Sequence, residues 1–306
     1  MSAVDRMELM QTFVRIVDSG SLSAAAAHLG TTQPTVSRRL RSLENLLGVE
    51  LLLRSTHALK LTDDGERCYG HARRLMEGWA ALEEEIKGAG AEPVGRLRVK
   101  VPHAFGQDQL VGPLVSYLKR YNQVSVDWIL NDRPPDFITE NIDCAIHVGP
   151  VTGPSHVAVL LAEIPRIVVA APELVDHTKL TRVEQLADLP WVALSTFYMH
   201  EIALQSTDFK STVRFPVSPR MSSDSLFAIH RAALDGLGAA IVSSWIADDD
   251  LKNGRLVNLF PEWQAPSLPV YLVYPYASYY PIRMEKFFEA VRDFMPGLVG
   301  VRPRHR

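Results

Sequence analysis

The stretch that decides the N-terminal fold is GSLSAAAAHLGTTQPTVSRRLRSL, residues 20–43. It predicts two short helices joined by a tight turn. The alanine run favours the first helix, and Gly30 can end that helix in the left-handed conformation. Thr31 or Thr32 can cap the second helix, since both precede Pro34, which is tolerated in a first turn. Residues 20–43 are therefore predicted to form a helix–turn–helix.

The second helix separates an apolar stripe from a polar surface. The apolar positions recur at i, i+4, i+7 and i+11, and are Val36, Leu40, Leu43 and Leu47. The other faces carry Gln33, Thr35, Ser37, Arg38 and Arg41. Glutamine and arginine can bind base edges through paired hydrogen bonds, and serine and threonine suit phosphate oxygens. The pattern favours a helix that lies in the major groove of DNA; the alternative is an ordinary helix pair with a solvated arginine face.

A β-hairpin is predicted directly after this helix. Residues 49–54 form a first strand, residues 55–58 a turn and residues 59–62 a return strand. Residues 31–62 hold five basic and two acidic residues, a formal charge of +3, whereas the whole chain carries −3. The basic charge is therefore concentrated at one end, which favours a nucleic-acid surface there.

These elements together resemble the winged helix-turn-helix of LysR-type transcriptional regulators. The resemblance is carried by AAHLGTTQPTVSRRLRSLE at residues 26–44, by Leu47-Gly48, by Arg54, and by LTDDG at residues 61–65. It implies a sequence-specific DNA-binding regulator, not an enzyme, with an effector-binding C-terminal region. The residues it places against DNA are Thr32, Gln33, Pro34, Thr35, Ser37, Arg38, Arg41, Arg54, His57 and Lys60. Relatives often carry arginine at the wing tip, so a neutral His57 would weaken minor-groove contact.

A long helix over residues 63–88 is predicted after the wing, with Thr62 as its cap. Its apolar positions are spaced 4, 3, 4, 3 and 4, and are Cys68, Ala72, Leu75, Trp79, Leu82 and Ile86. That spacing forms a heptad seam, which needs a partner to bury it. The partner is either the chain's own domain or a second copy. The resemblance implies antiparallel pairing with a copy, and hence a homodimer or homotetramer.

Residues 89–93, AGAEP, form a small, flexible segment broken by proline and therefore predict a hinge. Beyond it, strands alternate with helices, which predicts parallel sheets covered on both faces. Helices are expected over 107–121, 224–234 and 282–295. Strands are expected over 96–101, 124–130, 143–148, 191–194, 212–217, 239–242, 256–260 and 269–274. The apolar run 157–171 is too long for one strand and suits a crossover between subdomains.

The expected fold class is therefore α+β multidomain. A DNA-binding domain occupies residues 1–62, and a linker helix with its hinge occupies residues 63–94. The resemblance implies a periplasmic-binding-protein-like effector domain of two α/β subdomains over residues 95–306. Subdomain I spans residues 95–161 and 268–300, and subdomain II spans residues 162–267.

The candidate effector site lies where strands end, because ligands of open α/β sheets bind beyond the carboxyl ends of the strands. Ser222 or Ser223 also precedes a helix, whose free amides suit an anion. The simpler alternative for each residue is structural: a serine that caps a helix, or a histidine satisfied in the core. The full candidate set is His103, Ala104, Phe105, Asn131, His147, Ser195, Thr196, Phe197, Ser222, Ser223 and Ser243.

Other functional classes lack their motifs. The run Gly236-Leu237-Gly238 lacks the third glycine of a dinucleotide site and follows a helix, and no nucleophile elbow, phosphate loop or HExxH is present. A pI near 6.4 disfavours a non-specific nucleoid protein. Two cysteines are too few for a disulfide framework, and we expect neither metal nor cofactor. No apolar run approaches 18 residues, so no membrane contact is expected. We expect a cytoplasmic protein whose partners are double-stranded DNA, a small-molecule effector and RNA polymerase.

Overall fold

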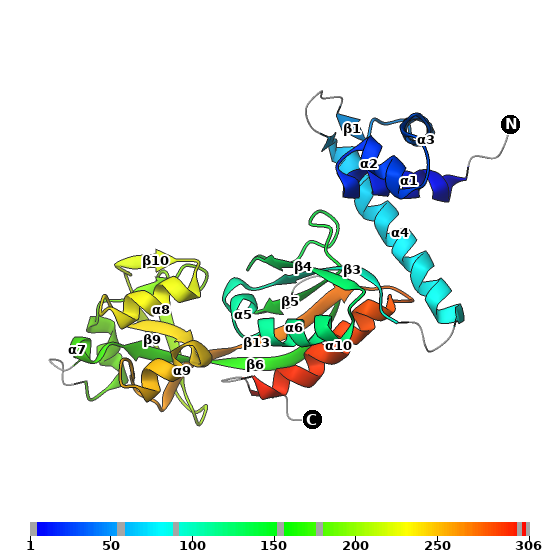
Figure 1. Ribbon diagram of the computed structural model, residues 1–306. Helices are drawn as coiled ribbons and strands as arrows, with labels where there is room; N and C mark the ends of the chain where they lie inside the picture. Colours follow the sequence, from blue (N-terminus) through cyan, green and yellow to red (C-terminus); the bar gives the residue numbers. More distant parts are fainter. Residues whose placement is uncertain are drawn as a thin grey trace.

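The structure is a computed structural model that describes residues 5–53, 59–87, 92–151, 156–175, 180–298 and 302–303. Figure 1 shows three parts in chain order: a small helical unit, one long helix, and an α/β region of two lobes. Two long strands run from one lobe into the other. This order agrees with the α+β multidomain organisation expected from the sequence.

The N-terminal unit contains α1 (Arg6–Ser19), α2 (Leu22–His28) and α3 (Gln33–Leu47). The hydroxyl of Ser21 caps α2 by accepting from the Ala24 amide at 3.1 Å. The glycine after α3, Gly48, has φ +74° and closes that helix. The apolar stripe of α3 is buried at three of the four predicted positions. The prediction was wrong for Leu47, which is 47% exposed because the last turn of α3 extends past the core.

The wing is shorter than predicted in the part that the structure describes. Strand β1 (Leu52–Leu53) pairs antiparallel with β2 (Lys60–Leu61). The predicted contacts Arg54 and His57 lie outside the described residues. The backbone of Leu51 fixes the hairpin, because its amide donates to the Glu44 carboxylate of α3 at 3.0 Å. The wing and α3 therefore form one packed unit.

The long helix α4 spans Asp63–Lys87, which confirms the helix predicted over residues 63–88. The Thr62 hydroxyl accepts from the Gly65 amide at 2.9 Å and caps it. Glycine is required at residue 65, because a Cβ there would lie 2.1 Å from the Leu51 carbonyl oxygen. The start of α4 is thus packed directly against the wing.

The two lobes share one mixed sheet, whose path runs β11-β6-β13-β5-β3-β4. Its strands are β3 (Gly95–Val101), β4 (Val124–Leu130), β5 (Cys144–Val148), β6 (His156–Ala170), β11 (Ala240–Ser243) and β13 (Trp263–Pro275). Strand β3 pairs parallel with β4 and β5, as expected. The expectation of wholly parallel sheets was wrong, because β13 pairs antiparallel with both β5 and β6.

Strands β6 and β13 are the two segments that cross between the lobes in Figure 1. The prediction that residues 157–171 are too long for one strand was wrong, since β6 is one strand of 15 residues. It stays continuous because β13 runs beside it from one lobe into the other. The expected subdomain limits, between residues 161 and 162 and between 267 and 268, fall within these two strands.

Each lobe is closed by its own helices. The first lobe carries α5 (His103–Gln107), α6 (Val111–Arg120) and α10 (Ile282–Phe294), and the second carries α7 (Pro172–Val175), α8 (Leu226–Leu234) and α9 (Ser244–Lys252). The helix predicted over residues 107–121 corresponds to α6, which begins only at Val111 because Asp108 leaves helical geometry at φ −126° and ψ −79°. Helix α5 lies almost entirely before the predicted range. Among the described residues, no helix is long and apolar enough to cross a bilayer.

The remaining short elements complete the second lobe and the C-terminal edge. They are the 3-10 helices η1 (Val183–Asp188) and η2 (Met295–Gly297), and the strands β7 (Val192–Leu194), β8 (Glu201–Ser206), β9 (Thr212–Pro216), β10 (Met221–Ser223), β12 (Val257–Asn258) and β14 (Arg302–Pro303). Strand β8 has no counterpart in the sequence prediction. It pairs with β9 and with the start of β13.

Candidate DNA-binding surface and effector cleft

Helix α3 presents its predicted polar residues to solvent. The side chains of Gln33, Arg38 and Arg41 are exposed. Within the described residues, neither Arg38 nor Arg41 has an acidic partner. Arg39 differs, because it forms an ion pair with Glu8 of α1 and holds the helices together. The surface of α3 therefore keeps two uncompensated cations.

The other predicted DNA contacts border this surface. Thr32 and Pro34 are exposed at the start of α3, whereas Thr35 and Ser37 are half-buried. The hydroxyl oxygens of Thr32 and Thr35 lie 3.0 Å apart. Lys60 is exposed on β2. The first turn of α3 and the return strand of the wing are thus both accessible.

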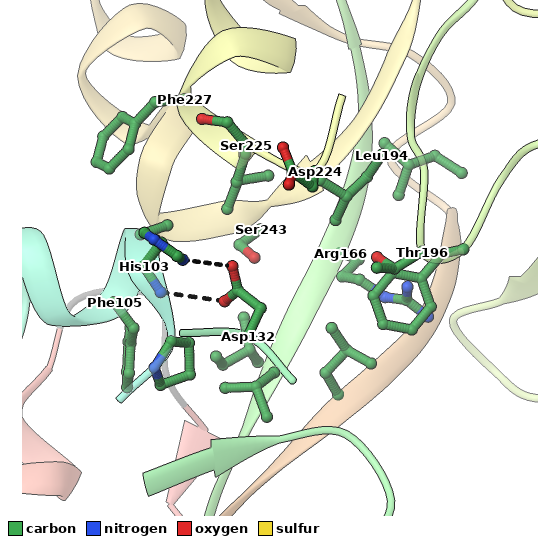
Figure 2. A pocket seen from close by; sticks show the side chains of 18 of the residues that line it. His103, Phe105, Asp132, Arg166, Leu194, Thr196, Asp224, Ser225, Phe227 and Ser243 are labelled. Atoms are coloured by element: carbon green, nitrogen blue, oxygen red, sulfur yellow. Dashed lines mark hydrogen bonds and ion pairs between the residues drawn. The ribbon is translucent and has the colours of Figure 1, made fainter. Parts of the chain in front are cut away.

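A cavity of about 460 Å³ lies where the lobes meet, and Figure 2 shows its lining. Seven of the predicted effector residues line it: His103, Ala104, Phe105, His147, Thr196, Phe197 and Ser243. These come from both lobes. This cavity is a concave site large enough for a small organic molecule.

Four predicted effector residues do not line this cavity: Asn131, Ser195, Ser222 and Ser223. The side-chain Oδ1 of Asn131 accepts from the Arg133 backbone amide instead. The Ser223 hydroxyl accepts from the amide of Ser225, and Ser225 is the residue that caps α8. These polar groups are therefore used in local backbone structure.

Several lining residues are absent from the candidate set, among them Asp132, Arg166, Tyr198, Asp224, Ser225, Phe227 and Trp245. Asp132 holds the first turn of α5. One of its oxygens accepts from the His103 amide at 3.0 Å, and the other lies 2.9 Å from His103 Nδ1. The neighbouring Asn131 was chosen from the end of the strand, so the correct side chain lay one residue further on.

His147 is buried beside this pair. Burial lowers the pKa of His147, although a hydrogen bond with the Pro150 backbone raises it in part. Lys100 also lowers the pKa, and Asp132 raises it. The net environment favours the neutral imidazole.

Arg166, on β6, is the least expected feature of the cavity wall. Its side chain is 8% exposed, and its Nε and Nη2 both donate to the Pro266 carbonyl oxygen of β13. Its Nη1 is buried without a hydrogen-bond partner. Burial lowers the pKa of Arg166. The rings of Phe197 and Tyr198 lie 5.1 and 5.2 Å from the guanidinium carbon.

The heptad positions of α4 fall into two groups. Ala72 is buried in the chain's own fold, and Cys68 packs on the core of the N-terminal unit, where burial raises its thiol pKa. Leu75, Trp79 and Ile86 are 58%, 53% and 76% exposed. Leu82 is half-buried. The seam is thus partly covered within the chain and partly open.

Helix α4 also contacts the first lobe. Arg73 Nη2 donates to the Asp143 carboxylate at 2.6 Å, and both side chains are largely buried. The other Asp143 oxygen accepts from the Arg98 amide of β3 at 2.6 Å. Asp143 therefore joins the long helix to the strand next to β5.

Two family models together cover most of the chain. The model of the bacterial regulatory helix-turn-helix protein, lysR family, matches residues 7–66. The model of the LysR substrate binding domain matches residues 90–296. The chain belongs to the LysR family of transcriptional regulators.

Two transcriptional regulators resemble this chain over most of their length. The transcriptional regulator PtxR of Pseudomonas aeruginosa is 29% identical, over 94% of this chain and 92% of its own. The transcriptional activator TtdR of Escherichia coli is 33% identical, over 87% of this chain and 86% of its own. A full-length OxyR variant from Pseudomonas aeruginosa has the same fold, with a TM-score of 0.71, 18% identity and 99% coverage of both chains.

Proposed function

We propose that this LysR-family chain binds specific duplex DNA through α3 and the wing, and that a small molecule in the cleft controls it. The observation that supports this best is the exposed α3 surface, with Arg38 and Arg41 free of acidic partners in the described structure. Neither side chain is held in an ion pair within the described structure. Either can bind a base edge or a phosphate without breaking an internal ion pair.

The same chain acts as a homodimer or homotetramer in this proposal. Leu75, Trp79 and Ile86 expose apolar surface along one side of α4. A second copy would cover them, and two copies would hold two recognition helices for half-sites about one helical turn of DNA apart. The family assignment supports this arrangement.

Control by an effector requires unequal affinity for two arrangements of the lobes. The cavity is lined from both lobes, so its shape depends on how they are placed. The Arg73–Asp143 contact would carry a change in the first lobe to α4. We infer that the effector alters the spacing of the DNA-binding units, and through this the contact with RNA polymerase in the cytoplasm.

Footprinting on fragments of the source genome tests this proposal. We expect a protected region with two half-sites, and retention of that fragment against excess unrelated duplex. Failure to retard any duplex at low salt would contradict DNA binding. Equal affinity for all fragments would contradict sequence specificity and leave a general DNA-binding protein.

A further inference from the structure

We propose that the cleft takes a small aromatic monocarboxylate, and that Arg166 binds its carboxylate. This inference rests on the proposed function, because it names the chemical class of the molecule that enters the cleft. Three observations carry it: a buried cation without an acid, a fixed and unused N–H donor, and an aromatic wall.

The first observation is the missing counter-charge. A buried charge is expensive unless it is paired, and buried arginines are usually found with a carboxylate. In the described part of the chain no carboxylate pairs with Arg166. Its hydrogen-bond acceptor is the neutral carbonyl of Pro266. The fold therefore supplies hydrogen bonds for part of the guanidinium but no negative charge.

The second observation is the unused donor on a fixed guanidinium. Because Nε and Nη2 are both held by Pro266 on β13, the guanidinium has one fixed orientation. Nη1 then stays without a partner, although Arg166 lines the cavity. The Arg166 guanidinium therefore lacks a hydrogen-bond acceptor at Nη1 and a negatively charged partner. A carboxylate supplies both, with a charge-assisted hydrogen bond.

Phe197 is the cover that a ligand has to move. Its ring lies over the guanidinium, and the side chain is 42% exposed in the turn after β7. A half-exposed ring can rotate away with little loss of buried surface. Displacement of this ring would expose the guanidinium to an anion in the cavity.

The third observation is the wall that would hold the body of the ligand. Phe105 and Phe227 each contact Trp245, with ring centroids 6.0 and 6.2 Å apart. An aromatic body would gain offset or edge contacts there. Asp132 and Asp224 also line the cavity and lie away from Arg166 in Figure 2. Two carboxylates on that side disfavour a ligand with a second negative charge.

Calorimetry on the full chain with three probes tests the inference. The probes are phenylacetate, its neutral isostere phenylacetamide, and the dianion 1,4-phenylenediacetate. We expect phenylacetate to bind at least about 10-fold more tightly than either of the others. Arg166→Met should weaken phenylacetate binding by roughly 10- to 100-fold and leave the binding of phenylacetamide unchanged. Arg231→Met is the matched control, because Arg231 is an exposed arginine of α8 that does not line the cavity.

Equal binding of phenylacetate and phenylacetamide to the unmodified chain would overturn the inference, even if Arg166→Met does not fold. Tighter binding of the dianion, or failure of all three probes at millimolar concentration, would also overturn it. DNA retardation measured on the same preparation separates the two proposals. A chain that retards its operator but ignores phenylacetate keeps the proposed function and loses the carboxylate, whereas loss of both is a failure of the proposed function.

Discussion

The proposed DNA-binding surface and the proposed effector cleft use arginine in opposite ways. Arg38 and Arg41 stand exposed on one helix, where water already solvates them. Arg166 lies buried on β6, one of the two crossing strands, and has lost most of that water. An exposed cation binds a polyanion mainly by releasing counterions, so it contributes affinity that depends on salt. A buried cation with a fixed fork recognises one anionic group of defined geometry.

The largest expected difference between the two sites is therefore their response to salt. Raising the salt from about 50 to 200 mM should weaken operator binding by roughly 10³-fold or more, because several phosphates are contacted together. The affinity for phenylacetate should change by less than about threefold, since a buried pair is little screened. Titrations of both ligands at the two salt concentrations measure this. A cleft as salt-sensitive as the DNA surface would mean that Arg166 is hydrated in solution.

A second way to distinguish the two sites is to disrupt the proposed dimer. Trp79→Asp places a charge on the exposed part of the α4 seam and should yield monomers. Operator affinity should then fall by about 10²- to 10⁴-fold, because two half-sites are no longer bound by one particle. Phenylacetate affinity should stay unchanged, since the cavity is lined within one chain. Light scattering and DNA retardation give the two readouts.

His71→Asp is the control for that substitution, because His71 is exposed on the same helix outside the seam. It should leave both the particle mass and the operator affinity as they are. An unchanged mass for Trp79→Asp would show that the exposed seam is not where copies meet.

The third test concerns a single side chain of the DNA surface. Arg38→Ala should cost about 1–3 kcal/mol of operator binding and relax specificity at one base pair, if Arg38 reads a base edge. Arg231→Ala is the matched control, because it removes one exposed arginine from α8. It should leave operator binding unchanged. Equal weakening on operator and random DNA, with a salt slope lower by about one, would identify Arg38 as a phosphate contact.

The contrast between the two sites also explains what the sequence could predict. The α3 surface is contiguous, so helical periodicity places its exposed residues directly. Arg166 lies within an apolar run, which indicates a buried strand and gives no sign of a ligand. Its carbonyl partner is 100 residues away in the sequence, and its covering ring comes from the turn after β7. The pairing of β6 with β13 brings the Pro266 carbonyl to Arg166, and the packing of the turn after β7 adds the ring.

The same limit applies to the strand order and to the polar cleft residues. Alternating strands and helices predict parallel pairing, but the crossing strands pair antiparallel because they run in opposite directions between lobes. Ser222 and Ser223 were chosen because ligands bind near strand ends. The residue that caps α8 and lines the cavity is instead Ser225. Positions near strand ends are predictable, whereas the orientation of each side chain depends on the tertiary structure.

The smallest expected effect is on pH dependence. The pKa of His147 is lowered from the ordinary value of 6.5, mainly by burial. The unfolded chain therefore binds more protons at this residue, so its contribution to stability is complete above about pH 6.5 and is lost as pH falls through the lowered pKa. Lys100 strengthens the shift and Asp132 opposes it.

His147→Gln should flatten that part of the stability profile, measured by urea unfolding at about pH 5.5, 6.5 and 7.5. His71→Gln, at an exposed histidine of α4, should keep the slope of the unmodified chain. A profile unchanged by His147→Gln would mean that the imidazole is hydrated in the cleft. Because Arg166 lines the same cavity, that result would also predict a wet, salt-sensitive guanidinium and would remove the contrast between the two sites.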